Sequence, residues 1–246
     1  MTRAASFIQP DMFAAPRFAG WPLAPLEPQA YDFIMIDPPW SFTLRSVKGE
    51  GKSAQAHYAT MTLADIQALP VGDLAREHCW LWLWCTAPMM PRQLACLEAW
   101  GFDYVTQIVW RKVTVNGKPA MGQGYVSRSL HEPVVIAKRG EPQICRALPS
   151  LFDGVRREHS RKPDEAYQIA ERFCPVGRRA DVFAREHRPG WEAFGDEVGK
   201  FAGKPVIAAQ PLEPPILVAP PQAATRSAER ALPAPAGARL AREATL

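Results

Sequence analysis

The tetrapeptide Asp37-Pro38-Pro39-Trp40 carries the residue types best suited to chemistry in this chain. It follows the apolar run at residues 33–36, a pattern typical of a buried strand that delivers polar groups to a sheet edge. The prolines fix their φ angles and lack N–H groups, so the turn is stiff and its carbonyls are free. These groups suit an amine on a planar ring, which would donate to Asp37 and to the Pro38 carbonyl while Trp40 or a nearby aromatic residue stacks on the ring. The alternative is an ordinary strand-to-turn exit.

A glycine-bearing stretch follows at residues 41–55. Its segment GEGKS, residues 49–53, resembles the end of a phosphate-binding P-loop, but Ser46 stands where that pattern needs glycine and no strand precedes it. An NTPase is therefore disfavoured. We interpret the stretch as a loop over the Asp37 site, with Arg45 and Lys48 available to phosphates.

The elements that must position these residues alternate along the chain. Strands are expected at residues 32–37, 79–85, 104–110, 133–137 and 181–184, and helices at residues 62–69, 91–100 and from 163 onward. Thr62 is a plausible N-cap, Gly101 ends the second helix, and Pro163 would be the first residue of the third. This alternation predicts an α/β fold around a mostly parallel sheet.

The composition indicates one globular domain between two irregular ends. We expect a proline-dotted lead-in at residues 1–29, an ordered domain at residues 30–202 and a flexible Pro/Ala-rich tail at residues 203–246. The net charge of +4 is compatible with a polyanionic partner. Five scattered cysteines suit reduced thiols in the cytoplasm, and neither a signal peptide nor a membrane-spanning run is evident. No metal-finger spacing is present, so no metal site is expected.

From residue 31 to 201 the chain resembles the methyltransferase-A 70-kDa-subunit family, whose members methylate the exocyclic amine of adenine with S-adenosylmethionine. The resemblance is carried by several blocks in the family's order. These are DPPW at 37–40, HYATM at 57–61, the Trp-rich stretch at 79–86, HEP at 131–133, KPDE at 162–165, FAREH at 183–187, Trp191 and GDE at 195–197. It implies a Rossmann-like methyltransferase fold in permuted motif order.

The resemblance also implies a set of cofactor contacts. Asp37 would receive the ammonium of S-adenosylmethionine, and Lys138, just past the strand at 133–137, would bind its carboxylate, since strand ends present ligand groups in open α/β sheets. Ribose and methionine contacts would come from the segment that follows the strand at 181–184 and from the block at 195–197. The residues are Arg185, His187, Arg188, Asp196 and Glu197. The family often has Asn at the position of Arg188, and Asn with Gln or Glu at the positions of Asp196 and Glu197, so this chain departs from the family pattern at the ribose and adenine contacts.

On the acceptor side, Tyr58 matches a tyrosine near the family's acceptor pocket. Arg111 and Lys112 begin a second long loop, residues 111–130, whose basic, glycine-containing composition suits nucleic-acid contact. Ordinary packing of Tyr58 and ordinary surface charge in the loop remain open. Trp80, Trp82 and Trp84 alternate along a strand and are expected in the core.

The function implied is adenine N6-methylation in nucleic acid by a bacterial or phage-type enzyme. DNA is preferred over RNA because the compact domain resembles the bacterial members. The competing hypothesis is a non-catalytic homologue that binds nucleic acid beside an active partner. Retention of all four residues of the motif at 37–40, together with Lys138 and Arg185, favours activity. A homo- or heterodimer is compatible with the sequence, which does not fix the oligomeric state.

Overall fold

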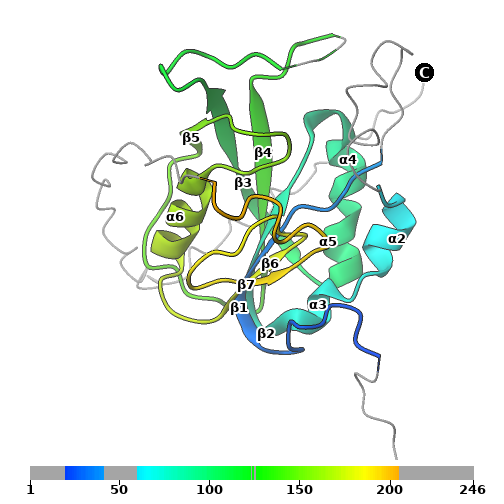
Figure 1. Cartoon of the computed structure of the whole chain (residues 1–246). Helices are drawn as coiled ribbons and strands as arrows, with labels where there is room; N and C mark the ends of the chain where they lie inside the picture. Colours follow the sequence, from blue (N-terminus) through cyan, green and yellow to red (C-terminus); the bar gives the residue numbers. More distant parts are fainter. Residues whose placement is uncertain (1–19, 42–59, 123, 125, 205–246) are drawn as a thin grey trace, which may run out of the picture. The chain divides into compact units, whose positions relative to one another are not determined.

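The described part of the protein is built on one seven-stranded sheet. The computed structural model describes residues 20–41, 60–122, 124 and 126–204. The strand order across the sheet is β5-β3-β4-β2-β1-β6-β7 (Figure 1). In chain order the strands are β1 (Tyr31–Ile36), β2 (Ala75–Trp84), β3 (Asp103–Val113), β4 (His131–Arg139), β5 (Leu151–Val155), β6 (Arg179–Val182) and β7 (Glu192–Phe194).

Strand direction decides which residues share an edge of the sheet. β1 pairs in parallel with β2 and with β6, β6 with β7, and β3 with β5. β4 alone among these seven strands is antiparallel to its neighbours β2 and β3. The predicted α/β Rossmann-like fold with a mostly parallel sheet is confirmed. The first residues of β4 therefore lie beside the last residues of β2.

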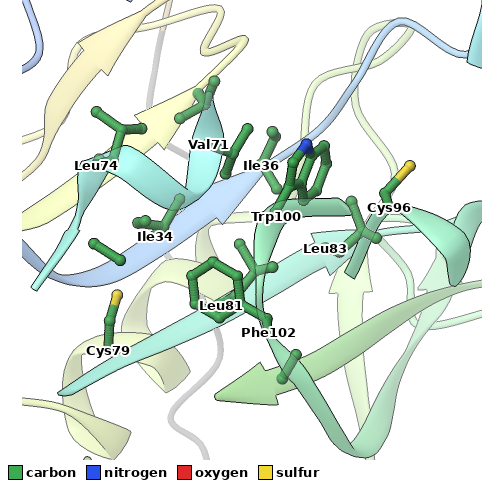
Figure 2. Packing of buried hydrophobic residues seen from close by; sticks show 14 of the residues in the cluster. Ile34, Ile36, Val71, Leu74, Cys79, Leu81, Leu83, Cys96, Trp100 and Phe102 are labelled. Carbon is green, nitrogen blue, oxygen red and sulfur yellow. The ribbon is translucent and has the colours of Figure 1, made fainter. Parts of the chain in front are cut away.

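Helices cover both faces of the sheet (Figure 1). One face carries α2 (Leu63–Ala68), α3 (Val71–Leu74), α4 (Met90–Gln93) and α5 (Ala95–Trp100), and the other carries α6 (Asp164–Phe173). Figure 2 shows the first core, in which Ile34, Leu81 and Leu83 of the strands pack beside Val71 and Trp100 of the helices. Burial of apolar side chains on both faces stabilises the sheet between its helices.

The second core lies under α6 and is aromatic. Trp80, Trp82 and Trp84 alternate along β2 and all belong to it, as expected. Phe173 of α6 packs on Trp80 and Trp82 with ring centroids 4.8 and 5.8 Å apart. Because Met35 of β1 points to the same face, residue 37 also turns toward α6 by the two-residue period of a strand.

Two of the predicted helix boundaries are confirmed, and two other features of the predicted helices differ. Thr62 caps α2 and accepts from the Asp65 N–H, and Gly101 ends α5 with a left-handed φ of 71°. Pro163 is the N-cap of α6 instead of its first residue, and the helix expected at 91–100 is divided at Leu94 into α4 and α5.

Three features of the sheet were not predicted. The short strands β5 and β7 were missed because each has five residues or fewer and no apolar run of its own. β3 extends to Val113, so Arg111 and Lys112 lie in a strand and not in a loop.

None of the described helices is both long and apolar enough to cross a membrane.

Candidate active site

Asp37 stands at the edge where β1, β2 and β6 end. Its N–H donates to the carbonyl of Val182, the last residue of β6, at 3.2 Å. The Pro38 carbonyl, expected to be free, accepts the N–H of Trp40 at 2.8 Å. A carbonyl oxygen has two lone pairs, so one remains for an external donor. The backbone of the motif is thus anchored to the sheet, and its acidic side chain is only 19% exposed.

Trp40 occupies a different place from the one expected. Its side chain is 4% exposed in the first core, and its indole N–H donates to the Trp84 carbonyl at 3.1 Å. Its backbone forms an isolated parallel bridge with Met61. A ring buried on this scale has almost no surface to offer a base, so Trp40 anchors the motif and the expected stacking role is not supported.

The cation beside Asp37 is Lys162. Its Nζ lies 3.2 Å from Asp37 Oδ2 and 3.0 Å from Glu132 Oε2, and it sits 4.8 Å from the centroid of the Trp84 ring. Lys162 directly precedes the N-cap of α6, so the start of that helix positions it. Glu132, at the beginning of β4, also pairs with Lys112 at 2.5 Å. The site is therefore a row of alternating charges, two carboxylates and two ammonium groups.

Burial and these charges compete in setting the pKa of each group. Burial raises the pKa of Asp37, and the Lys162 charge offsets this only in part. Burial alone would raise the pKa of Glu132, but Lys162 and Lys112 lower it to about 2. Burial alone would lower the pKa of Lys162, but Asp37 and Glu132 outweigh it and raise that pKa. Lys162 is therefore cationic at neutral pH and favours the anionic form of Asp37.

Lys138, the lysine expected to bind the cofactor carboxylate, lies at the opposite end of the sheet. It pairs with Trp80, four residues before Trp84, which corresponds to ~13 Å along the strand. Its Nζ pairs instead with Glu141 at 2.9 Å. The structure does not bring Lys138 to Asp37, because the expectation assumed a parallel strand, whereas the end of antiparallel β4 points away from Asp37.

A small cavity opens beside Asp37, between two segments of chain. We call residues 157–162, which lead into α6, the first wall, and residues 183–188, which follow β6, the second wall. The cavity is lined by Asp37, Trp84, Ser160, Arg161, Lys162, Tyr167, Asp181, Phe183, Ala184, Arg185 and Glu186. Ser160 and Phe183 have φ angles of 62° and 63°. Left-handed backbone at non-glycine residues costs about 1–2 kcal/mol each, and such strain clusters at functional sites.

The expected cofactor residues of the second wall and of the block at 195–197 lie in three different environments. Arg185 lines the cavity and pairs with Glu197, which also binds Lys200 at 2.5 Å. His187 and Asp196 are exposed. Arg188 turns inward and pairs with Asp164 at 2.5 Å and with Glu186. These residues lie near one edge of the sheet, but only Arg185 reaches the cavity.

Asp181 is a buried acid in the cavity that sequence reasoning missed. It is 4% exposed, on the same sheet face as Asp37, and accepts the Tyr167 hydroxyl at 2.8 Å. Burial raises its pKa to about 7, while the Tyr167 hydrogen bond and Arg188 act in the opposite direction. The cavity floor therefore carries an acid that titrates near neutral pH.

Of the residues expected to contact the substrate, some lie outside the part of the chain that the structure describes. Arg45, Lys48 and Tyr58 lie outside the described residues. Arg111 is half exposed and paired with Asp153 at 2.5 Å, while Lys112 is held in the site by Glu132. Lys162 was missed as a site residue, although the block at 162–165 that contains it was recognised.

Known proteins resemble this chain over the same region. A family model described as MT-A70 matches residues 31–197. A type II methyltransferase, M.MunI of Mycoplasma sp, is 30% identical over 188 residues, which cover 68% of this chain and 78% of that protein. A putative N(6)-adenosine-methyltransferase MT-A70-like protein of Medicago truncatula is 30% identical over 68% of this chain but 26% of its own length. The human N(6)-adenosine-methyltransferase catalytic subunit METTL3 is 28% identical over 67% of this chain and 28% of its own.

Proposed function

Because the chain belongs to the MT-A70 family of S-adenosylmethionine-dependent adenine N6-methyltransferases, we propose that it methylates adenine in DNA at the Asp37 site. The observation that carries the site is the contact between Asp37 and Lys162, 3.2 Å apart at the edge of the sheet. DNA is proposed over RNA because the chain covers 78% of the type II relative but 54% of a relative named as an RNA methyltransferase.

The charges at this site suit the methyl donor. The amino-acid end of S-adenosylmethionine carries an ammonium and a carboxylate, and the cavity offers the carboxylate of Asp37 beside the ammonium of Lys162. Lys162 thus takes the role expected of Lys138, with Arg185 as a second cation. When bound, the donor supplies an electrophilic methyl group on sulfur.

The chain's own groups would prepare the acceptor. The lone pair of the adenine amine is delocalised into the ring, so two acceptors on its N–H groups help to hold the nitrogen out of conjugation. The Asp37 carboxylate is one, and the second lone pair of the Pro38 carbonyl is the other. No strong base is needed, because the nitrogen becomes acidic only as it gains the methyl group. Positioning of the two reactants supplies most of the rate enhancement. In a duplex the target base must first be flipped out of the stack.

The cysteines favour a reducing compartment. All five are free, and Cys79, Cys85, Cys96 and Cys174 are buried while Cys145 is exposed. We propose a cytoplasmic location on this basis.

The test is methylation itself. The protein is incubated with adenine-containing DNA or RNA of matched sequence, and N6-methyladenine is measured by mass spectrometry. DNA should be the better substrate, and Asp37→Ala should lose more than 90% of the rate, a barrier increase above about 1.4 kcal/mol. Faster methylation of RNA would overturn the DNA assignment, and an active Asp37→Ala variant would overturn the site. A wild-type protein that binds DNA but never methylates it would favour the non-catalytic alternative.

A further inference from the structure

Five charged side chains connect the two walls of the cavity. Arg161 of the first wall donates to Glu186 of the second through Nε and Nη2, at 3.2 and 2.9 Å. Arg188 of the second wall pairs with Asp164 of α6 at 2.5 Å and with Glu186. Arg157 of the first wall donates to both oxygens of Asp164, at 2.8 and 3.0 Å. We call this set of five residues the bridging cluster.

The cluster is buried, unlike most ion pairs on protein surfaces. The side chains of Arg157 and Arg161 are each 3% exposed, Asp164 is 6%, Arg188 13% and Glu186 16%. Exposed ion pairs contribute little to structure, whereas removing one partner of a buried pair leaves an uncompensated charge. Within the cluster three cations face two carboxylates, and Arg161 also pairs with the partly exposed Glu158 at 3.2 Å.

The cluster also touches the residue that contacts Asp37. Arg157 donates from Nη2 to the Lys162 carbonyl at 2.5 Å. It therefore fixes the backbone from which the Lys162 side chain reaches Asp37. A shift of Asp164 or Arg157 would be transmitted directly to this lysine.

Arg188 is the member that pairs closely with both carboxylates, whereas Arg157 lies 2.8 Å from Asp164 but 3.9 Å from Glu186. Its guanidinium lies 3.8 Å from the centroid of the Tyr167 ring, whose hydroxyl binds Asp181 in the cavity. Stacking on one face while bonding two carboxylates in its plane is specific to a planar guanidinium, and a lysine ammonium cannot reproduce it.

We propose that Arg188 is a positioning residue for the methyl donor. By bridging Asp164 and Glu186 it holds the two walls at the separation that places Lys162 against Asp37, without itself contacting the donor. The inference rests on the proposed placement of the donor in this cavity. It replaces direct cofactor contact, the role that the sequence suggested for Arg188.

The chain offers a matched control in Arg178. That residue also bridges two carboxylates, Glu27 at 2.9 Å and Glu192 at 2.8 Å, and lies 5.1 Å from the centroid of the Tyr31 ring. It directly precedes β6, so it stands at the end of the strand away from Asp37. A general loss of stability should follow substitution of either arginine.

The experiment compares Arg188→Gln with Arg178→Gln in the full chain. Calorimetry with S-adenosylhomocysteine, at a temperature where both variants are folded, should show about tenfold weaker binding for Arg188→Gln and less than twofold change for Arg178→Gln. The KM for S-adenosylmethionine should rise in parallel, DNA affinity should stay unchanged, and Arg188→Lys should not restore binding. If Arg188→Gln does not fold, Glu186→Gln, which keeps the shape but weakens the bridge, should give the same pattern.

Two results would contradict this role. One is wild-type donor affinity in the folded Arg188→Gln or Glu186→Gln variant, and the other is an equal loss in Arg178→Gln. If the wild-type protein itself fails to bind S-adenosylhomocysteine, the proposed donor site is wrong, which is a different outcome from intact binding in the variants.

Discussion

Replacing Lys162 by Met should impair methylation by letting Asp37 take up a proton. Methionine keeps most of the side-chain length but removes the charge that lies 3.2 Å from Asp37 Oδ2. Burial already raises the pKa of Asp37, and Lys162 is the group that opposes this most. A protonated Asp37 is a poorer acceptor for the adenine amine, so the reaction should depend on this charge.

The distance gives the size of the effect. Two unit charges 3.2 Å apart at an effective dielectric constant of 20 attract by about 5 kcal/mol. A change of about 1.4 kcal/mol moves a pKa by one, so loss of the lysine charge should raise the pKa of Asp37 further and favour its protonated form. We expect the rate at pH 7 to fall about tenfold or more, and the deficit to shrink as pH rises to 9 and the carboxylate re-forms.

The assay is single-turnover methylation of a DNA oligonucleotide at saturating S-adenosylmethionine from pH 6 to 9, so that weaker donor binding does not enter the rate. Thermal unfolding checks that the variant is folded, because breaking a buried pair costs about 3–5 kcal/mol. Lys138→Met is the control, since the ion pair of Lys138 among the described residues is with exposed Glu141, and it should keep wild-type activity. A Lys162→Met variant with more than a tenth of the wild-type rate at pH 7, or with the same deficit at every pH, would refute the reasoning.

Two further substitutions test other parts of the site. Asp181 keeps its proton up to about pH 7 when folded but only to about 3.8 when unfolded, so the native state binds more protons between these values and the free energy of unfolding falls as pH rises through them. Asp181→Asn should remove this pH-dependent loss of stability, which amounts to at most about 4 kcal/mol. Urea unfolding at pH 5 and pH 8 measures it, and a pH dependence equal to that of the wild-type protein would contradict the assignment of Asp181. Trp40→Phe loses the buried bond to the Trp84 carbonyl and should lower the free energy of unfolding by about 1–2 kcal/mol, with DNA affinity intact. Weaker DNA binding at unchanged stability would instead show that the Trp40 ring stacks on a base.

Local patterns were sufficient to place Asp37. The apolar run before it specifies a buried strand, and the prolines after it specify the stop, so both are encoded within ten residues. The cap at Thr62 and the left-handed end at Gly101 were predictable for the same reason. Each depends on neighbours in sequence alone.

The site lysine was not predictable in that way. The run at residues 133–137 reads the same whether the strand is parallel or antiparallel, so the sequence could not exclude Lys138 or point to Glu132. Arg157 and Lys162 sit in a loop so rich in charge that it resembles a solvated surface. In the folded protein the cations of this segment are buried because they pair with carboxylates on α6, on β4 and in the segment after β6. Only the tertiary structure brings these carboxylates together.

Because β1 pairs with β6, the sheet around Asp37 can be completed only late in synthesis of the chain. The β1 edge that presents Asp37 bonds to Val182, and at the other end Asp32 accepts the N–H of Arg178, 146 residues later in the chain. At about 5–20 residues per second, a ribosome needs roughly 7–30 s to cover that separation. Throughout this interval the nascent chain carries its reactive motif on a strand with one open edge, and the backbone contact that holds Asp37 cannot form. Activity should therefore appear only when β6 has emerged and folded.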